Sequence, residues 1–185
     1  MKTIPPAAAA ERMLIREITE TDYPAVLDLN LESVHFLSPL SRERLERLLA
    51  QSAYHKVLEE DGRITAFILA FLADADYDSP NFLWLKNRCA PFLYIDRLVV
   101  RSDCRGMGLG TNLYRDLFSH AGTIDIPRIT CEVDIQPPNP VSLRFHRRWG
   151  FQEIGSQWTP DGKKRVLFME KYLNGGEGIA ATATE

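Results

Sequence analysis

Between residues 92 and 113 the chain reads FLYIDRLVVRSDCRGMGLGTNL, an apolar strand followed by a glycine-rich turn and the start of a helix. The part that ends at Val100 is rich in aromatic and β-branched residues, which is typical of a buried strand. Gly106, Gly108 and Gly110 follow, and apolar residues then recur at helical spacing. This order gathers free backbone N–H groups and the positive end of a helix dipole at one point. Because glycines also permit close approach, the stretch predicts a site for an anion such as a pyrophosphate.

Two well-known phosphate loops fit this stretch badly. A Walker A loop ends in Gly-Lys-Ser/Thr, whereas Gly110 is followed directly by Thr111, without a lysine. The dinucleotide fingerprint needs GxGxxG spacing near the first strand, whereas these glycines are evenly spaced and lie mid-chain. The remaining alternative is a glycine-rich turn that only caps a helix.

The composition excludes several classes of protein. With 185 residues, of which 45% are hydrophobic and 25% charged, the chain suits one domain with its own core. A net charge of −3 argues against a basic nucleic-acid-binding surface, and the arginine-rich pieces at 42–47 and 144–148 are interpreted as solvated helix faces. No run approaches the roughly 18 apolar residues of a membrane span. The three cysteines and four histidines show no metal-ligand spacing. We therefore expect a cytoplasmic protein without metal, membrane or nucleic-acid partners.

The other elements alternate along the chain. Strands are expected at 13–18, 54–60, 63–72, 92–100, 128–134, 151–157 and 164–172, and helices beginning at Thr21 or Asp22, at Ser41, near Met107 and after Asn139. This order predicts an α/β (α+β) fold: a mixed, mostly antiparallel central sheet of about seven strands, with the fourth and fifth strands parallel and helices flanking it. A single domain is expected at 13–173, between a flexible N-terminus (1–12) and a flexible C-terminal tail (174–185).

The connection from Ala73 to Pro91 is long and carries several aromatic residues, among them Tyr77, Phe82 and Trp84. Its composition is too aromatic for a solvated linker. We expect it to be either a lid over an active site or an interface between subunits, which would make the protein a homodimer.

Two motifs together resemble a known family. The run from Arg105 to Gly110, R-x-x-G-x-G after a strand, resembles the coenzyme A pyrophosphate loop of the GNAT (Gcn5-related) N-acetyltransferase superfamily. After the fifth strand that family usually shows Asn, a small residue, an aromatic pair ending in Tyr, and then Gly-Phe. This chain has Asn139, Ser142, Phe145-His146 and Gly150-Phe151 at the same spacing, with His146 in place of the tyrosine. The order of the elements also resembles the GNAT fold.

The resemblance implies an enzyme that uses acetyl-CoA as co-substrate. The fourth strand would pair with the pantetheine arm, the glycine loop would hold the pyrophosphate, and a backbone N–H near Leu98 or Val99 would stabilise the oxyanion. The residues implied in acetyl-CoA binding are Leu98, Val99, Val100, Arg105, Gly106, Met107, Gly108, Leu109, Gly110, Thr111, Asn139, Ser142 and Phe145.

Glu132 is the candidate general base. Its setting, Cys131-Glu132-Val133, resembles the Leu-Glu-Val of bacterial ribosomal-protein N-terminal acetyltransferases, in which the glutamate takes that role. Two extra residues around Pro137-Pro138 separate it from Asn139 relative to that pattern. The alternatives are a surface carboxylate without a catalytic part, or Asp96 or Tyr94 as the base.

His146 is the candidate acid for the departing thiolate. An imidazolium with an unperturbed pKa of about 6.5 is a better proton donor than a tyrosine of about 10. The alternative is a histidine that only packs near Trp149.

The acceptor is expected to be the primary amine of a small molecule, because the aromatic segment should narrow the site. The residues expected to bind it are Tyr77, Phe82, Trp84, Tyr94 and Asp96. The alternatives are a protein N-terminal acetyltransferase, suggested by Glu132, and a non-catalytic acyl-CoA-binding regulatory module, suggested by the missing tyrosine.

Overall fold

Residues 13–173 are described by the computed structural model, so the ends expected to be flexible, 1–12 and 174–185, lie outside the described residues. The strands are β1 (Met13–Glu17), β2 (Tyr54–Glu60), β3 (Arg63–Leu72), β4 (Leu93–Val100), β5 (Arg128–Gln136), β6 (Gln152–Trp158) and β7 (Arg165–Tyr172). The helices are α1 (Tyr23–Leu31), α2 (Arg42–Gln51), α3 (Pro80–Cys89), α4 (Leu109–Ala121) and α5 (Pro140–Arg148), with single 3-10 turns at Glu20–Asp22 and Ser102–Cys104.

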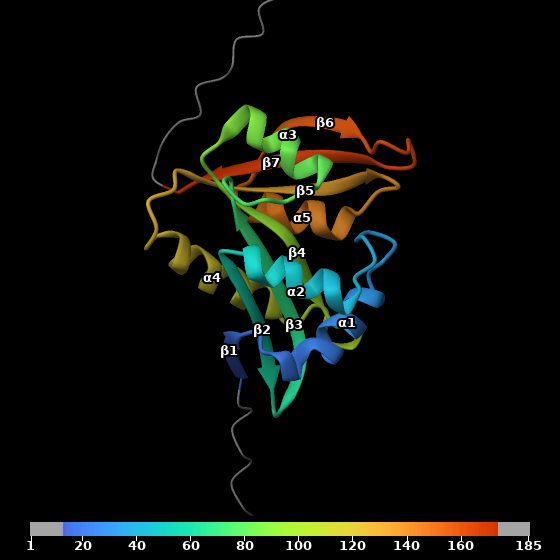
Figure 1. The fold of residues 1–185 in the computed structure, drawn as a ribbon, viewed down its shortest axis with the longest axis vertical. Helices are drawn as coiled ribbons and strands as arrows, with labels where there is room; N and C mark the ends of the chain where they lie inside the picture. Colours follow the sequence, from blue (N-terminus) through green and yellow to red (C-terminus); the bar gives the residue numbers. More distant parts are fainter. Residues whose placement is uncertain (1–12, 174–185) are drawn as a thin grey trace, which may run out of the picture.

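The strands form one seven-stranded sheet in the order β1-β2-β3-β4-β5-β7-β6 (Figure 1). Every neighbouring pair is antiparallel except β4 and β5, which are parallel. The expected mixed sheet is therefore confirmed. Asp61 and Gly62 turn the chain between β2 and β3 with positive φ angles of 49° and 82°, and Asp-Gly is a favoured pair for such a hairpin turn.

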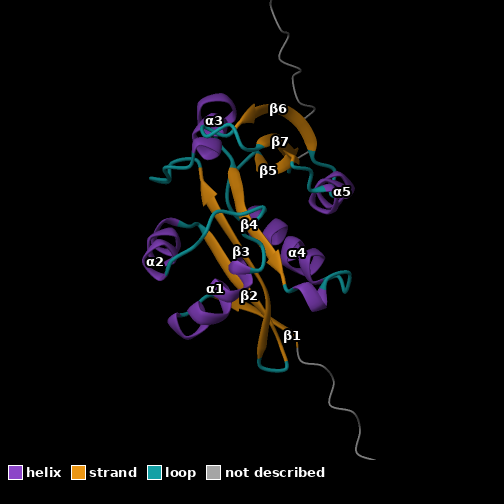
Figure 2. Cartoon of the chain, turned by 90° about the vertical axis from the view of Figure 1, so that its right-hand side faces the viewer, coloured by secondary structure: helices purple, strands orange, loops and turns teal. Residues whose placement is uncertain are grey.

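Helices cover both faces of the sheet, with α1, α2 and α3 on one face and α4 and α5 on the other (Figure 2). Because side chains alternate along a strand, each face has its own core. Phe67 and Tyr94 enter the core under α1 to α3, whereas Ile68 and Ile95 enter the core under α4.

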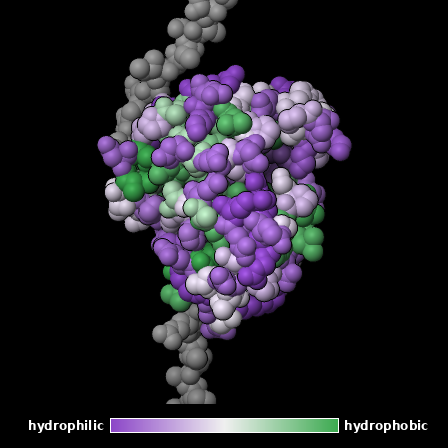
Figure 3. Space-filling model, in the orientation of Figure 1, coloured by the Kyte–Doolittle hydropathy of each residue, from purple (hydrophilic) through white to green (hydrophobic). Residues whose placement is uncertain are grey.

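The outer face of α2 is polar. Ser41 caps this helix by accepting a hydrogen bond from the backbone N–H of Arg44 at 3.2 Å. Leu45 and Leu48 are buried beneath it, whereas Arg42 and Arg47 are exposed. Hydrophilic side chains gather over α2 in the space-filling view (Figure 3). These arginines are thus a solvated helix face, as expected.

The segment from Ala73 to Pro91 contains the helix α3, which the sequence analysis does not predict. The hydroxyl of Ser79 accepts a hydrogen bond from the Phe82 backbone N–H at 3.4 Å, and Pro80 occupies the first turn. Ser-Pro is an ordinary helix start, so the signal was present in the sequence.

Phe82 and Trp84, expected to wall the acceptor site, are instead packing residues. Phe82 has no exposed surface and meets Phe92 and Tyr94 edge to face, with ring centroids 5.8 and 5.5 Å apart. The indole of Trp84 stacks on Phe168 of β7 at a centroid distance of 4.0 Å and an interplanar angle of 12°. Aromatic stacking therefore anchors α3 to the sheet, which does not suit a lid that opens.

Candidate active site

The two parallel strands diverge soon after they meet. β4 pairs with β5 only from Leu93 to Ile95. A β-bulge leaves Asp96 out of register with β3, and a bulge bends its strand. From Asp96 to Val100, no described strand pairs with β4 on its β5 side. The two strands therefore leave an opening between them, and an amide-bearing ligand can add to the free strand edge.

The glycine loop lies beyond the end of β4, at the N-terminus of α4. Gly106 and Gly108 have φ angles of 83° and 86°, a region that other residues rarely adopt. A Cβ atom added at either position would meet no atom within 4 Å, so both face open space. Arg105 folds back, its Nε donating to the Val100 carbonyl at 3.2 Å. The loop therefore offers first-turn N–H groups of α4 to an anion without side chains in the way.

Gly110 brings the two motifs together. A Cβ atom on it would lie 3.7 Å from side-chain atoms of Leu98, Val100 and Phe145, so α4, β4 and α5 meet at this point. The neighbouring loop residue Met107 is exposed, with 64% of its surface accessible.

Asn139 closes the turn between β5 and α5. Its side-chain oxygen accepts from the Ser142 backbone N–H at 3.1 Å, and its own N–H donates to the Asp134 carbonyl at 2.9 Å. The extra residues Pro137-Pro138 lie within this turn. They are therefore accommodated after Asp134 and leave Glu132 in its strand position.

Glu132 lies on the face of β5 that α1 to α3 cover, one residue beyond the last β4–β5 pair. Its side chain is partly exposed, but Oε2 has no accessible surface and no hydrogen-bond partner among the described residues. Oε1 accepts from Nδ2 of Asn81 at 3.2 Å. Burial raises the pKa of Glu132 to about 8; the nearby Tyr94 hydroxyl and Asn81 oppose this rise, and the charges of Asp96 and Asp134 add to it.

The two alternative base candidates are less available. Asp96 accepts from the Tyr77 hydroxyl at 2.6 Å through one oxygen and from Nε of Arg97 at 2.9 Å through the other. Tyr94 is fully buried, its hydroxyl has no partner among the described residues, and burial raises its pKa well above the usual value. Of the two carboxylates, Asp96 has both oxygens engaged, whereas Oε2 of Glu132 accepts no hydrogen bond of normal geometry from the described residues.

His146 lies in the core on the other face of the sheet, 5% exposed. Its Nδ1 is 2.8 Å from the Ser142 carbonyl and its Nε2 is 2.7 Å from the Tyr114 hydroxyl. A carbonyl only accepts, so Nδ1 carries the proton and Tyr114 donates to Nε2. Burial lowers the pKa of His146 to about 4. The imidazolium expected near neutral pH is therefore wrong for this ring, which is neutral at pH 7.

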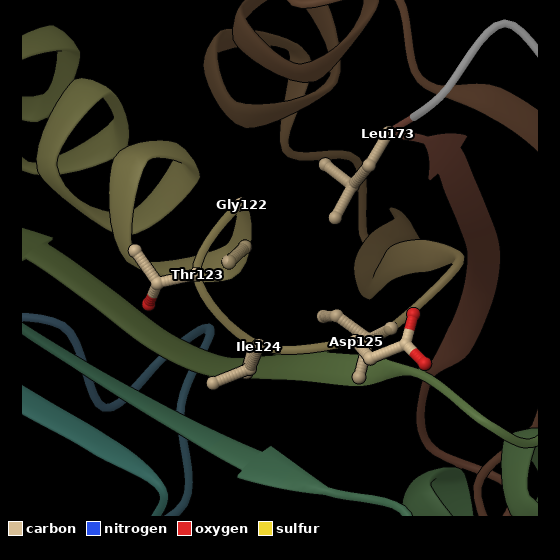
Figure 4. A pocket seen from close by; sticks show the side chains of 7 residues that line it. Gly122, Thr123, Ile124, Asp125 and Leu173 are labelled. Carbon is tan, nitrogen blue, oxygen red and sulfur yellow. The ribbon is translucent and has the colours of Figure 1, made fainter.

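A pocket lies at the opposite end of α4 from the glycine loop. It is lined by Ala121, Gly122, Thr123, Ile124, Asp125, Ile126 and Leu173 (Figure 4). A second hollow lies near Pro91 and Phe92. Phe92 adjoins the start of β4, whereas the glycine loop follows the end of that strand, so this hollow and the loop lie at opposite ends of β4.

Within 13–173, no three His, Cys, Asp or Glu side chains are grouped so that they could hold a metal ion. No helix in the same range has the length and apolar character to cross a membrane.

A sequence model of the Acetyltransferase (GNAT) family matches residues 13–151, which include the glycine loop, Glu132 and the Asn139 motif. The chain belongs to the GNAT acetyltransferase family. It is a GNAT N-acetyltransferase that binds acetyl-CoA. This family membership favours the enzyme over the alternative of a non-catalytic acyl-CoA-binding module.

Relatives of this GNAT acetyltransferase extend along most of the chain. An uncharacterized N-acetyltransferase of Methanocaldococcus jannaschii is 25% identical over 165 residues, covering 88% of this chain and 94% of the relative. The ribosomal-protein-S18-alanine N-acetyltransferase of Escherichia coli has a similar structure, with a TM-score of 0.68, 16% identity, and coverage of 91% and 98% of the two chains. The Salmonella typhimurium putative acetyltransferase yncA, solved with its cofactor acetyl-CoA, has a TM-score of 0.66, 19% identity, and coverage of 91% and 98%. At these identities the solved structures show the fold alone.

Four side chains near Glu132 or His146 were not expected from the sequence: Asn81, Gln157 and Lys164 on the Glu132 side of the sheet, and Tyr114 in the core beside His146. Tyr114 follows Gly110 by four positions, so the helical period could have placed it on the inner face of α4. No local pattern marks Asn81, because its contact with Glu132 depends on how α3 docks on the sheet.

Proposed function

We propose that this enzyme transfers the acetyl group of acetyl-CoA to the primary amine of a small molecule by direct attack on the thioester. The observation that carries this proposal is the unpartnered, buried Oε2 of Glu132 beside the opening between β4 and β5. In the reaction the amine nitrogen bonds to the acetyl carbon and the carbon–sulfur bond breaks. Glu132 takes the amine proton, and coenzyme A leaves as a thiolate.

The free edge of β4 and the glycine loop would hold acetyl-CoA. Backbone groups from Leu98 to Val100 have no β5 partner and suit the amides of the pantetheine arm. The open space beside Gly106 and Gly108 suits the pyrophosphate. Asn139 uses its side-chain oxygen to cap α5, which leaves its N–H₂ group to donate to the arm. The proposed contacts further include Arg105, Met107, Leu109, Gly110, Thr111, Ser142 and Phe145.

Glu132 has the properties of a base for this reaction. A general base is most effective when its pKa lies near the working pH. Burial raises the pKa of Glu132 to about 8, closer to that of an alkylammonium, which is near 10. Proton transfer from the amine to Glu132 is therefore less unfavourable than proton transfer to an ordinary carboxylate.

The thiolate leaves, in this proposal, without a proton from His146. The neutral ring uses its Nδ1 proton to bond the Ser142 carbonyl, and its Nε2 accepts from Tyr114. A free thiol of this kind has a pKa of about 8.5, so a thiolate is an acceptable leaving group near neutral pH.

The contacts of Lys164 support a small acceptor. Its Nζ donates to the carbonyls of His35 and Phe36 at 2.8 and 3.1 Å and to Asp134 at 2.9 Å. All three N–H groups are thus used to tie the α1–α2 connection to β5, two residues from Glu132 on the same face. This closure favours a compact amine over a polypeptide that must pass between these segments.

A protein N-terminal acetyltransferase is the second candidate, favoured by the strand position of Glu132. Thiol release should be measured over a panel of small amines and short peptides, with the wild type, Lys164→Met and Lys163→Met. Lys163 is the matched control, because its side chain is 80% exposed. We expect the wild type and the control to use small amines, and Lys164→Met to gain activity on peptides. Efficient peptide acetylation by the wild type would establish the second candidate instead.

We place the reaction in the cytoplasm. Cys89, Cys104 and Cys131 are free thiols, which suits a reducing compartment.

A further inference from the structure

Helix α3 reaches Glu132 through one side chain. Asn81, in the first turn of α3, donates from Nδ2 to Oε1 of Glu132 at 3.2 Å. Gln157 of β6 donates in turn from Nε2 to Oδ1 of Asn81 at 3.0 Å and to the Pro80 carbonyl at 3.5 Å. A chain of hydrogen bonds therefore runs from the edge strand β6 through α3 to the carboxylate on β5.

This chain fixes the orientation of both groups at its inner end. Oδ1 of Asn81 is occupied as an acceptor, so its N–H₂ group must face Glu132. Oε1 of Glu132 is occupied by that donor, so Oε2 is the oxygen left over. A carboxylate held by one oxygen presents the other in a single direction.

We propose that Asn81 is a positioning residue that holds Glu132 so that Oε2 faces the acceptor amine, and that Gln157 orients Asn81. Helix α3 is then a brace for the base rather than a lid. This inference rests on the proposed role of Glu132 as the base.

The packing of α3 supports a brace. Trp84, three residues after Asn81, stacks on Phe168 of β7, and Phe168 is the residue paired with Glu132 across the β5–β7 ladder. Before the helix, Tyr77 donates to Asp96 of β4 at 2.6 Å. α3 is thus attached on both sides of Glu132, which limits the movement of Asn81.

Other titratable groups also act on Glu132. Tyr94 and Asp96 approach from β4, Asp134 lies two residues along β5, and Tyr77 approaches from the segment before α3. Cys131 lies next to Glu132 in the strand but on the opposite face. Among these groups and Asn81, the amide of Asn81 supplies the hydrogen bond of normal geometry to the carboxylate. Removing the Asn81 amide should therefore raise the pKa of Glu132 further.

The test compares Asn81→Ala, Gln157→Leu and Glu132→Gln, with Asn87→Ala as the matched control. Asn87 lies on the same helix and is exposed. kcat/KM would be measured against pH with the best amine of the panel, and the Glu132 carboxyl would be titrated by carbon-13 NMR in the enzyme without substrate. Circular dichroism and thermal unfolding show whether each variant is folded.

The hydrogen bond from Asn81 favours the charged form of Glu132, so we expect Asn81→Ala to move the acidic limb and the NMR titration up by about one pH unit. Activity at pH 7 should then fall about tenfold and recover at high pH. Gln157→Leu should shift both in the same direction by less, and Asn87→Ala should match the wild type.

The outcomes separate the inference from the function it rests on. If Glu132→Gln abolishes activity but Asn81→Ala titrates like Asn87→Ala, the positioning role is wrong and the base remains. If Glu132→Gln keeps full activity, the proposed function fails first. A uniform loss at every pH in Asn81→Ala, with an unmoved NMR titration, would mean that the side chain only supports the fold.

Discussion

The hydroxyl of Tyr114 on α4 lies 2.7 Å from Nε2 of His146 on α5, and neither residue is more than 5% exposed. The pair belongs to the core under α4, on the opposite face of the sheet from Glu132. Since the ring is neutral, we expect this hydrogen bond to affect the stability of the protein and its dependence on pH, and not to supply a proton for catalysis.

The first prediction concerns this pair. His146→Phe leaves a buried hydroxyl without its acceptor, and Tyr114→Phe leaves a buried ring nitrogen without its donor, so each should cost roughly 1–3 kcal/mol of unfolding free energy. The double variant should cost less than the sum of the two, as measured by urea unfolding in a double-mutant cycle. Additive effects would show that the two side chains do not interact.

The same histidine predicts a loss of stability in acid. Its pKa is about 4 in the folded protein against 6.5 for an ordinary histidine, so the unfolded chain binds the extra proton first as pH falls. Unfolding free energy should therefore fall between pH 6.5 and pH 4, by up to roughly 3 kcal/mol. His146→Phe should lose this slope. The kcat of the wild type should therefore show no decrease between pH 6 and 7 that is due to His146. A decrease that is present in the wild type and absent in His146→Phe would show that His146 is the acid after all.

The glycine loop offers a well-matched pair of variants. Gly108 and Gly62 have φ angles of 86° and 82°, and an added Cβ atom would meet no atom within 4 Å at either. Alanine at either position should cost a similar roughly 1–2 kcal/mol of backbone strain. Only Gly108→Ala should weaken coenzyme A binding, by tenfold or more in calorimetry, because Gly62 lies in the β2–β3 turn. Equal affinity in both variants would contradict the phosphate loop.

Trp84 predicts a stability effect and not a change in selectivity. A Cβ atom at Gly155 of β6 would come within 2.7 Å of its ring, so the indole fits closely between β6 and Phe168. Trp84→Ala should lower unfolding free energy by about 3 kcal/mol, the low end for a large aromatic residue that is partly exposed. Its KM for acetyl-CoA should be unchanged under conditions where it is folded. A variant of native stability with broadened acceptor use would restore the idea of a lid.

Much of this site could be predicted because it depends on local order along the chain. The strand, glycine turn and helix from 92 to 113 predict an anion site by chain direction alone, and the spacing from Asn139 to Phe151 is a second local pattern. The opening after Ile95 follows from two parallel strands whose pairing ends early.

What could not be predicted depends on docking between distant segments. The hydrogen bonds from Gln157 to Asn81 and from Asn81 to Glu132 join residues 76 and 51 positions apart. The protonation state of His146 could not be predicted either, because it is set by burial beside Tyr114 and not by residue type. The aromatic character of Phe82 and Trp84 correctly indicated that this segment is not a solvated linker. Packing against the sheet explains that character as well as a substrate pocket does.

The central claim is that Glu132 takes the proton of the acceptor amine. The direct measurement is kcat/KM against pH from 6 to 10 for the wild type, Glu132→Gln and the control Glu153→Gln, whose carboxylate is 48% exposed on β6. Glutamine keeps the shape but accepts no proton, so kcat/KM at pH 7 should fall by roughly 10²–10⁴ and the limb near pH 8 should disappear, while the control keeps both. A change of less than about threefold at pH 7, with the wild-type limb intact, would show that Glu132 is not the base.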